Sequence, residues 1–376
     1  MRLLHTSDWH LGRSFHREDM LDAQARFIDH LVETVRSERV DAVLVSGDLY
    51  DRALPPVDAV ALCDEALLRL AAEKIRVVVI SGNHDSARRL GFGARLMDAA
   101  GVHVRSDPES VGRPVLLGDG TAVYGIPYLE PDVVRGRWEL AERGHTAALT
   151  EAMRRVRADL AGRDARSVVL AHAFVTGGEA SDSERDISIG GVASVPMSLF
   201  DGVGYAALGH LHGRQRLSET VRYSGSPLAY SFSEEHQVKG AWLVDLGETV
   251  SAEFVEAPVP RRIARVRGGL DDLLTGDRWS GYEDHWLQVT LTDVARPAGA
   301  MDRLRWRFQH TLVLAFEPEG TPAADDRLWA DRIRDRSEIE IACDFVGEVR
   351  GEPAGDAERA LLHEAFECCR RAETGR

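Results

Sequence analysis

The chain has 376 residues, 44% of them hydrophobic and 28% charged, a composition typical of a folded globular protein and not of a disordered chain. This length predicts two or three domains. No run of about 18 apolar residues predicts a membrane span, and the first residues reach Asp8 without an apolar signal core. We therefore expect neither secretion nor membrane insertion, and we expect a cytoplasmic protein.

The charge balance does not mark a nucleic-acid binder. Lys plus Arg amounts to 46 residues and Asp plus Glu to 61, so the net charge is −15. Such a protein can still hold DNA locally if metal ions neutralise some acids and arginines line a groove. Lys74 and Lys239 are the only lysines, an Arg bias to which we give no functional weight. The four cysteines, at 63, 343, 368 and 369, show no disulfide framework and are typical of reduced thiols.

Strand and helix patterns alternate over the first 100 residues, which favours a layered α/β domain. Arg2–His5 is an expected strand, and the apolar spacing over Glu18–Arg39 predicts a helix. Ala42–Val45 and Val77–Ile80 read as strands buried on both faces, with a helix over Pro56–Ala72 between them. Later elements are expected as follows: strands at Ala122–Ile126, Val168–Ala171, Tyr205–Leu208 and Gly240–Asp245, and a helix at Thr146–Leu160.

The composition shifts at Ala257–Pro260, which predicts a boundary. We expect a first α/β domain over residues 1–258, a small α/β domain over 259–320 and a helical segment over 321–376. The small domain has expected strands at Ile263–Arg267, Trp286–Thr292 and Leu312–Phe316 and a helix at Met301–Phe308. Pro318–Asp326 reads as a linker. The tail has an apolar stripe at Ala357–Arg370, which either packs on the second domain or docks a partner.

Polar residues follow five of the expected strands, at the carboxyl ends where open α/β sheets collect ligands. The spacing of 40 residues from Asp8 to Asp48 and of 35 from Asp48 to Asn83 suits successive βαβ units. We therefore expect one shared crevice. The residues are Asp8, His10, Asp48, Asn83, His84, Asp85, His172, His210 and His212.

This set supplies imidazoles, carboxylates and one amide but no thiolate. Such donors suit Mn²⁺, Fe²⁺ or Zn²⁺ better than Ca²⁺ or a structural zinc ion. A carboxylate that bridges two such ions, about 3.5–4 Å apart, would let them clamp a phosphate and activate water. Taken alone, His172 would be read as a core histidine, and Gly47-Asp48 as a turn. The combination at successive strand ends favours a metal site.

The same motifs resemble the signature of the calcineurin-like binuclear metallophosphoesterases, which have a four-layered αββα core. Further stretches resemble one branch, the bacterial SbcD-type nuclease subunits related to the Mre-type DNA-repair nucleases. The resemblance covers residues 1–260 and weakens beyond them. The stretches are His5–Gly12, Gly47–Arg52, Ile187–Gly191 and Tyr223–Pro227.

The resemblance implies a role for each motif residue. Asp48 would bridge two divalent ions, most simply Mn²⁺. One ion would also be held by Asp8, His10 and His212, and the other by Asn83, His172 and His210.

His84 would contact the scissile phosphate and protonate the leaving oxygen, with Asp85 orienting its ring. The alternatives for His84 are a further metal ligand and a group that contacts a ligand and not the metal. Archaeal and eukaryotic relatives carry a histidine where this chain has Asp51, so the contact made there stays open. Candidate substrate contacts are His16, Arg88 and Arg89, with Arg135 and Arg137 as further arginines; solvated surface positions are an equal alternative for each.

The resemblance further implies a Mn²⁺-dependent DNA phosphodiesterase of repair, recombination and replication, associated with the nucleoid. It would act as a 3′→5′ exonuclease on duplex ends and as an endonuclease on single strands and hairpins. Its partner would be an SbcC-type coiled-coil ATPase in a two-plus-two assembly, with the small domain capping the site. Two alternatives stay open: the same chemistry on a small molecule or phosphoprotein, and a metal-binding scaffold without catalysis.

Overall fold

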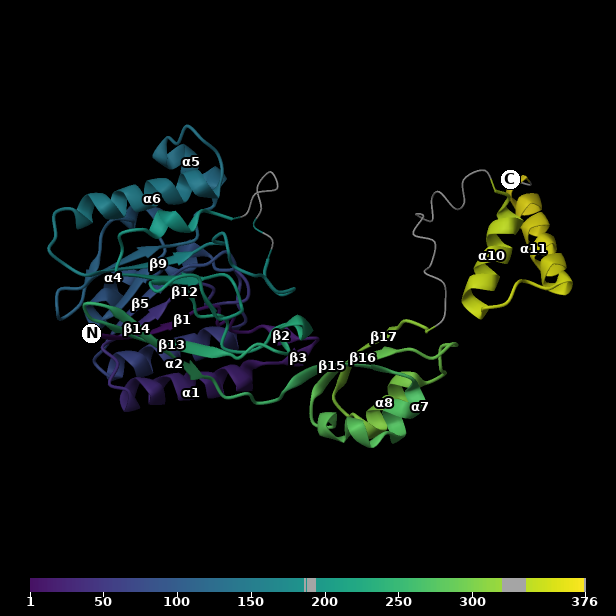
Figure 1. Cartoon of the computed structure of the whole chain (residues 1–376). Helices are drawn as coiled ribbons and strands as arrows, with labels where there is room; N and C mark the ends of the chain where they lie inside the picture. The colour runs from purple at the N-terminus through teal and green to yellow at the C-terminus, as the bar shows by residue number, and fades with distance from the viewer. Residues whose placement is uncertain (186, 188–193, 320–335, 375–376) are drawn as a thin grey trace. The chain divides into compact units, whose positions relative to one another are not determined.

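The computed structural model describes residues 1–185, 187, 194–319 and 336–374 (Figure 1). The chain divides into two compact units. Unit 1 comprises Met1–Arg265 and Asp284–Trp286, and unit 2 comprises Val266–Glu283 and Leu287–Arg376. The three-part division expected from the sequence stays a prediction. Among the described helices, none is both long and apolar enough to cross a membrane.

The described residues of unit 1 form two six-stranded sheets. In the first, β1, β4, β5 and β6 run parallel, whereas β13 and β14 join antiparallel. Its strands in order are β14 (Val250–Glu256), β13 (Gly240–Leu246), β1 (Arg2–Thr6), β4 (Ala42–Val45), β5 (Arg76–Ile80) and β6 (Val102–Arg105).

In the second sheet, β8, β9, β10 and β12 are parallel, and the two-residue edge strands are antiparallel. Its strands in order are β11 (Gln215–Arg216), β12 (Val221–Tyr223), β10 (Tyr205–Gly209), β9 (Ser167–His172), β8 (Ala122–Ile126) and β7 (Val115–Leu116). The remaining elements of unit 1 are the hairpin β2 (Ser14–Phe15) and β3 (Glu18–Asp19), the helices α1 (Leu21–Ser37), α2 (Val57–Ala72), α3 (Ala87–Leu90), α4 (Ala94–Met97), α5 (Pro131–Trp138) and α6 (His145–Leu160), and the 3-10 turns η1 (Asp98–Ala100), η2 (Pro108–Ser110), η3 (Met197–Phe200) and η4 (Phe232–Glu234).

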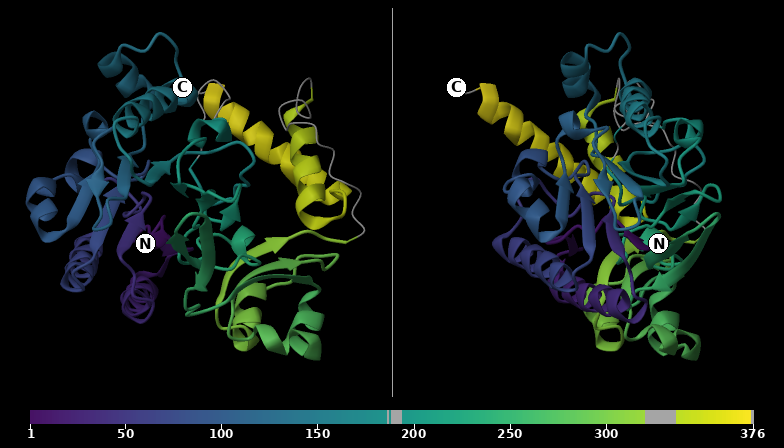
Figure 2. Two further views of the ribbon diagram at one scale, coloured as in Figure 1. Left: turned by 60° about the vertical axis from the view of Figure 1, so that its left-hand side comes forward. Right: turned by 90° about the vertical axis from the view of Figure 1, so that its left-hand side faces the viewer.

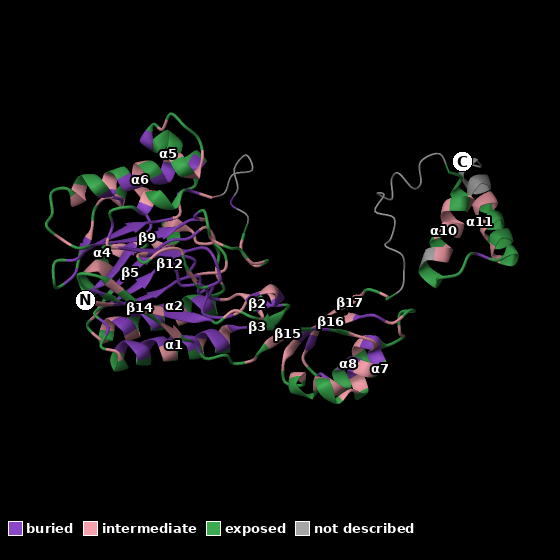
Figure 3. Cartoon of the chain, in the orientation of Figure 1, coloured by how far each residue is buried: buried purple, intermediate pink, exposed green. Residues whose placement is uncertain are grey.

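Alternate residues of each central strand face opposite layers, because side chains of a strand point to opposite faces. In β4, Val43 and Val45 pack against α1 and α2, whereas Ala42 and Leu44 pack between the two sheets. The outer face of the second sheet is covered in the same way by α5 and α6. The central strands of both sheets are buried (Figure 3) and lie between helices on both sides (Figure 2). The predicted four-layered α/β core is therefore confirmed.

Unit 2 holds most of a three-stranded sheet of the order β15 (Ile263–Gly268), β16 (Trp286–Leu291) and β17 (Thr311–Phe316). Its other elements are α7 (Leu270–Thr275), η5 (Asp277–Tyr282), α8 (Ala300–Arg307), α10 (Glu338–Arg350) and α11 (Asp356–Thr374). Leu287, Val289 and Leu291 are buried while their neighbours in β16 are half-buried, as the predicted alternation requires. The expected linker over Pro318–Asp326 lies, from residue 320 on, outside the described residues.

Two local predictions differ from the structure. The first helix begins at Leu21 and not at Glu18, because Glu18 and Asp19 pair with Phe15 and Ser14 in a hairpin. The strand β14 was not expected, because it lies at the edge of its sheet and alternates exposed with half-buried residues.

Candidate metal centre

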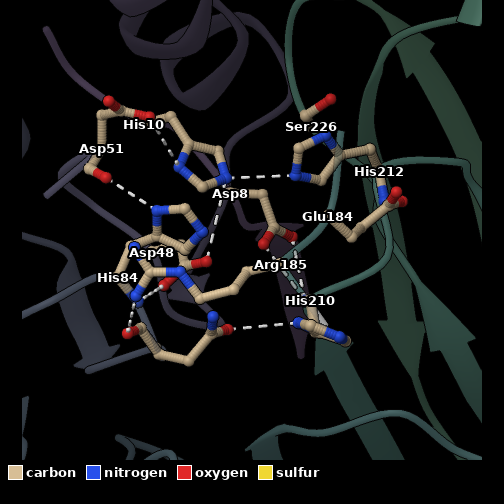
Figure 4. A network of polar contacts seen from close by, with 12 residues as sticks. Asp8, His10, Asp48, Asp51, His84, Glu184, Arg185, His210, His212 and Ser226 are labelled. Carbon is tan, nitrogen blue, oxygen red and sulfur yellow. Dashed lines mark hydrogen bonds and ion pairs between the residues drawn. The ribbon is translucent and has the colours of Figure 1, made fainter. Parts of the chain in front are cut away.

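The predicted crevice residues follow or end five strands, three from the first sheet and two from the second. Figure 4 shows the members Asp8, His10, Asp48, His84, His210 and His212 gathered in one place. These strands run parallel within each sheet, so their ends meet at one edge. Asp8 and His10 follow β1, Asp48 follows β4, residues Asn83 to Asp85 follow β5, His172 ends β9, and His210 and His212 follow β10.

The backbone at these loops is strained. Asp8, His10, Asp48 and His210 have positive φ angles of 53°, 45°, 50° and 103°. Non-glycine residues in this region cost on the order of 1–3 kcal/mol each and cluster at functional sites. Gly47 has a φ of 96°, and a Cβ there would overlap the ring of His172. The tight turn thus lets Asp48 and His172 approach each other.

The described residues contain three groups of side chains whose ligand atoms all lie within 4.8 Å of one another. Asp8, His10 and Asp48 each belong to two of these groups, so the groups overlap in one cluster, and the bridging role expected of Asp48 stays a prediction. The groups are Asp8, His10 and His212; His10, Asp48 and His84; and Asp8, Asp48 and His172.

The Asn83 half of the centre, which we define as Asn83, His172 and His210, converges on one amide oxygen. Asn83 Oδ1 lies 2.9 Å from His172 Nε2 and 3.2 Å from His210 Nδ1. His172 Nε2 also lies 3.4 Å from Asp48 Oδ2. The Nδ1–H of His172 donates to the Ser46 carbonyl over 2.9 Å, so Nε2 is the nitrogen that would offer its lone pair to a bound cation.

The His212 half, which we define as Asp8, His10 and His212, joins two imidazoles. His10 Nε2 lies 3.1 Å from His212 Nε2 and 3.8 Å from Asp48 Oδ2. Asp8 accepts the backbone N–H of His210 over 3.1 Å. All side chains of this half are buried.

Burial and close charges shift the titration of both halves. Burial raises the pKa of Asp8 to about 6, and burial lowers the pKa of His210 to about 3 and that of His10 well below its usual range. Although burial opposes it, the neighbouring His172 lowers the pKa of Asp48, and Asp48 in turn raises the pKa of His172 to about 9. Carboxylates and imidazoles crowded away from water are typical of a functional site.

These residues fit a pair of divalent ions. His172 Nε2 faces Asn83 Oδ1 and Asp48 Oδ2, two oxygens that can only accept a hydrogen bond. Without metal, a proton on Nε2 serves both oxygens, and a bound cation would take the place of that proton. A cation among them would satisfy all of these lone pairs. The donor set of nitrogen and oxygen without sulfur agrees with the metals expected from the sequence.

The structure corrects the expectation that Asp85 orients the ring of His84. The His84 Nδ1–H donates instead to the backbone carbonyl of Asp51 over 2.7 Å. Asp85 accepts the backbone N–H groups of Leu49, Tyr50 and Gly82 over 2.9–3.2 Å. Burial raises the pKa of Asp85 to about 7. Asp85 thus fixes the two loops that carry Asp48 and His84, and the catalytic part expected of it stays a prediction.

His84 itself lies at the centre. Its backbone N–H donates to Asp48 Oδ1 over 2.9 Å, and its ring packs edge-on against His10 with 4.7 Å between centroids. The roles considered for it, proton donor, metal ligand and partner of a ligand, are all compatible with this position.

The expected substrate contacts lie outside the ligand groups. His16 is exposed at the turn of the β2–β3 hairpin, with a φ of 48°, and its ring packs on Phe232. Arg88 and Arg89 lie exposed on α3, where Arg89 donates to the Ala53 carbonyl over 2.9 Å. Their predicted contacts with substrate stay predictions.

Three supporting residues were missed by the sequence analysis. Ser183, Glu184 and Glu234 all contact His212, the first two from the loop after β9 and the third from η4. No motif marks them, but Glu234 binds Lys239, and the rarity of lysine in this Arg-rich chain was a signal that could have directed attention there.

Comparison with known proteins agrees with this geometry. The calcineurin-like phosphoesterase family matches residues 1–214, more than half of the chain. The chain therefore belongs to the calcineurin-like phosphoesterases. Membership makes it a hydrolase of phosphoesters that depends on a binuclear metal centre, and the ligand groups described above are the candidates for that centre.

Solved structures are also similar to the chain. The protein TT1561 of Thermus thermophilus is 14% identical, with 67% of this chain and 98% of that one covered and a TM-score of 0.40. A dimetal phosphatase from Danio rerio is 14% identical, with 69% and 97% covered and a TM-score of 0.44. The calcineurin-like phosphoesterase YfkN from Bacillus subtilis is 12% identical, with 68% and 90% covered and a TM-score of 0.34. Sequence identities and TM-scores this low do not assign a substrate to this chain.

Proposed function

We propose that this phosphoesterase is a DNA nuclease of the SbcD type, with Mn²⁺ as its metal. It cleaves duplex ends in the 3′→5′ direction and cuts single strands and hairpins. An SbcC-type coiled-coil ATPase is its partner, in an assembly of two nuclease and two ATPase subunits that acts in DNA repair at the nucleoid. The alternative, a phosphodiesterase or phosphatase for a small molecule or phosphoprotein, has no observation in its favour that the nuclease lacks.

The observation that carries the proposal is the position of the stretches that resemble the nuclease branch. His5–Gly12 and Gly47–Arg52 are joined by a bridge in which the Leu11 N–H donates to the Leu49 carbonyl over 2.8 Å. Tyr223–Pro227 reaches the same place, because Ser224 Oγ lies 2.7 Å from Ser7 Oγ. Ser7 in turn donates to the Asp8 carboxylate over 2.5 Å.

The resemblance is therefore concentrated around the catalytic centre and is not scattered over the surface. This supports a shared reaction, although Ser188–Gly191 of the remaining stretch lies outside the described residues. Ile187, the described residue of that stretch, is buried and accepts the His145 ring N–H over 2.7 Å.

The side chains of the site divide the reaction between them. The ligand groups would hold two divalent ions, which would supply an activated water and positive charge in the transition state. Asp48 positions both halves of the centre, and its hydrogen bond from the His84 backbone fixes the loop after β5. The Asp51 carbonyl accepts the His84 Nδ1–H, so in the imidazolium form His84 carries a second proton on Nε2, which would pass to the leaving oxygen.

The test uses purified protein from which metal has been removed, with Mn²⁺ added back. Labelled hairpin and duplex DNA are compared with bis-p-nitrophenyl phosphate, beside Asp48→Asn and the exposed control Asp164→Asn. We expect Mn²⁺-dependent cleavage of DNA that is lost in Asp48→Asn and kept in the control. Hydrolysis of the chromogenic diester without DNA cleavage would favour the small-substrate alternative, and no turnover of either would favour a scaffold.

A further inference from the structure

A buried ammonium group lies directly behind the ligand loop of the His212 half. Lys239 is 5% exposed, and its Nζ lies within hydrogen-bond distance of four oxygens. These are the backbone carbonyl of His212 at 2.8 Å, Ser226 Oγ at 2.9 Å, Gln237 Oε1 at 2.8 Å and Glu234 Oε2 at 2.5 Å. We call this arrangement the Lys239 cage.

Glu234, which is 1% exposed, links the cage to the imidazole of His212. Its Oε1 accepts the hydroxyl of Ser183 and lies 3.4 Å from His212 Nδ1. Ser183 Oγ lies 2.6 Å from the same Nδ1. Since the hydroxyl proton of Ser183 is given to the carboxylate, its oxygen accepts the His212 Nδ1–H. The ring is thereby fixed in the tautomer that presents the Nε2 lone pair to the metal centre.

His212 is consequently held at three atoms. Lys239 binds its backbone oxygen, Glu184 Oε1 accepts its backbone N–H over 2.7 Å, and Ser183 with Glu234 binds Nδ1. A buried ion pair contributes little net stability compared with apolar residues of the same size. The cost of burying these charges beside a ligand therefore points to a role other than general stabilisation of the fold.

The residue type agrees with this role. The chain has 46 basic residues, of which two are lysines and 44 are arginines. An ammonium is compact and its three protons can turn toward acceptors on several sides, whereas a guanidinium is a planar fork. The Lys239 cage needs a compact cation, which explains a lysine at a position where the chain otherwise uses arginine.

We propose that Lys239 and Glu234 are positioning residues of the metal centre, which hold His212 in the tautomer and place that bind one of the two ions. The proposal rests on the metal-dependent part of the proposed function, with His212 as a ligand, and not on the DNA substrate. Loss of such an outer partner typically lowers metal affinity by about 10- to 100-fold.

The test is an equilibrium Mn²⁺ titration, followed by the electron paramagnetic resonance of the free ion, without any substrate. The main variant is Glu234→Gln/Lys239→Met, which removes both charges and nearly keeps the volume. Lys74→Arg, at the exposed second lysine, is the control, and Lys239→Arg tests the shape of the cation. Thermal unfolding without metal measures the stability of each protein.

In the double variant we expect one ion to lose affinity by about 10- to 100-fold while the other binds as in the wild type. We expect a smaller loss of the same ion in Lys239→Arg and none in Lys74→Arg. Wild-type affinity for both ions in a folded double variant would overturn the proposal, and so would equal weakening of both ions, which indicates a merely structural role.

If the double variant does not fold, the same Mn²⁺ titration of Ser183→Ala tests the proposal. This substitution changes no charge and removes the hydroxyl between His212 and Glu234. Selective weakening of one ion supports the proposal, and unchanged binding of both overturns it. A nuclease assay that fails while these affinities behave as expected would count against the DNA substrate alone.

Discussion

The two halves of the metal centre hold their histidines in different ways. In the Asn83 half, His172 donates to the Ser46 carbonyl, a backbone group at the end of β4. In the His212 half, His212 relies on Ser183 and Glu234, side chains from two separate loops. The first arrangement is dictated by the register of the sheets, because no substitution removes a carbonyl. The second depends on side chains and can be changed without changing the sheet.

This comparison suggests a division of work. We therefore expect the position of His172 to follow the strands, and the metal affinity of the His212 half to depend on the surrounding loops. Asp48 connects the halves, since its Oδ2 lies 3.4 Å from His172 Nε2 and 3.8 Å from His10 Nε2.

The largest effect is expected where the halves meet. Asp48→Asn removes a negative charge that lies between the two halves, so both ions should bind weakly. The kcat/KM for bis-p-nitrophenyl phosphate should fall by more than about 100-fold, the upper end of the loss expected for a residue that only supports a ligand. Steady-state rates over a range of Mn²⁺ concentrations measure this, with Asp164→Asn as the control. Recovery of the wild-type rate at saturating Mn²⁺ would show that Asp48 is not shared.

The next effect separates chemistry from metal binding. His84→Gln should lower kcat by about 10²- to 10⁴-fold, the range for loss of a general acid. If His84 is a proton donor and not a ligand, both halves should keep their ions. Mn²⁺ content measured beside kcat tests this. Loss of one ion together with activity would make His84 a ligand and not a proton donor.

A smaller effect is expected from the backbone of the Asn83 half. In Gly47→Ala, the added Cβ meets the His172 ring and the φ of 96° becomes strained. Such overpacking costs roughly 1–3 kcal/mol of stability. Urea unfolding measures it, with Gly118→Ala as a control, since a Cβ at Gly118 meets no atom within 4 Å. An unchanged unfolding free energy would mean that the half is less rigid than we infer.

The smallest effect concerns the substrate alone. If Arg88 contacts one DNA phosphate, Arg88→Ala should lower DNA affinity modestly and reduce the slope of log K against log salt by about 0.9. The rate of bis-p-nitrophenyl phosphate hydrolysis should be unchanged in this variant, because neither half of the metal centre is altered. Fluorescence anisotropy over a salt series, with Arg163→Ala as a surface control, provides the measurement. Equal slopes in wild type and variant would remove Arg88 from the DNA-binding surface.

Much of the fold was predictable because buried strands are nearly continuous apolar runs. Ala42–Val45 is a strand with the predicted bounds, and the strand predicted at Val77–Ile80 begins one residue earlier, at Arg76. Elements without such a run were missed, above all β14 at a sheet edge and the two-residue strands of the β2–β3 hairpin. These strands form because their backbones pair with a neighbouring strand, and not because their sequences are apolar.

For the site, the sequence located the residues but not their contacts. Motifs at strand ends identified the groups that meet, since parallel strands bring their ends together. The sequence could not show that the Asp51 carbonyl holds His84, because a backbone acceptor has no residue signature. Nor could it show that Glu234, 22 residues after His212 in the chain, lies behind that ligand.

The most direct test of a centre with two distinct halves is anomalous diffraction at the manganese edge from crystals soaked in Mn²⁺. We expect two peaks about 3.5–4 Å apart, one within reach of Asn83 and His172 and the other within reach of His10 and His212, with Asp48 between them. A single peak, or peaks away from Asp48, would contradict the account.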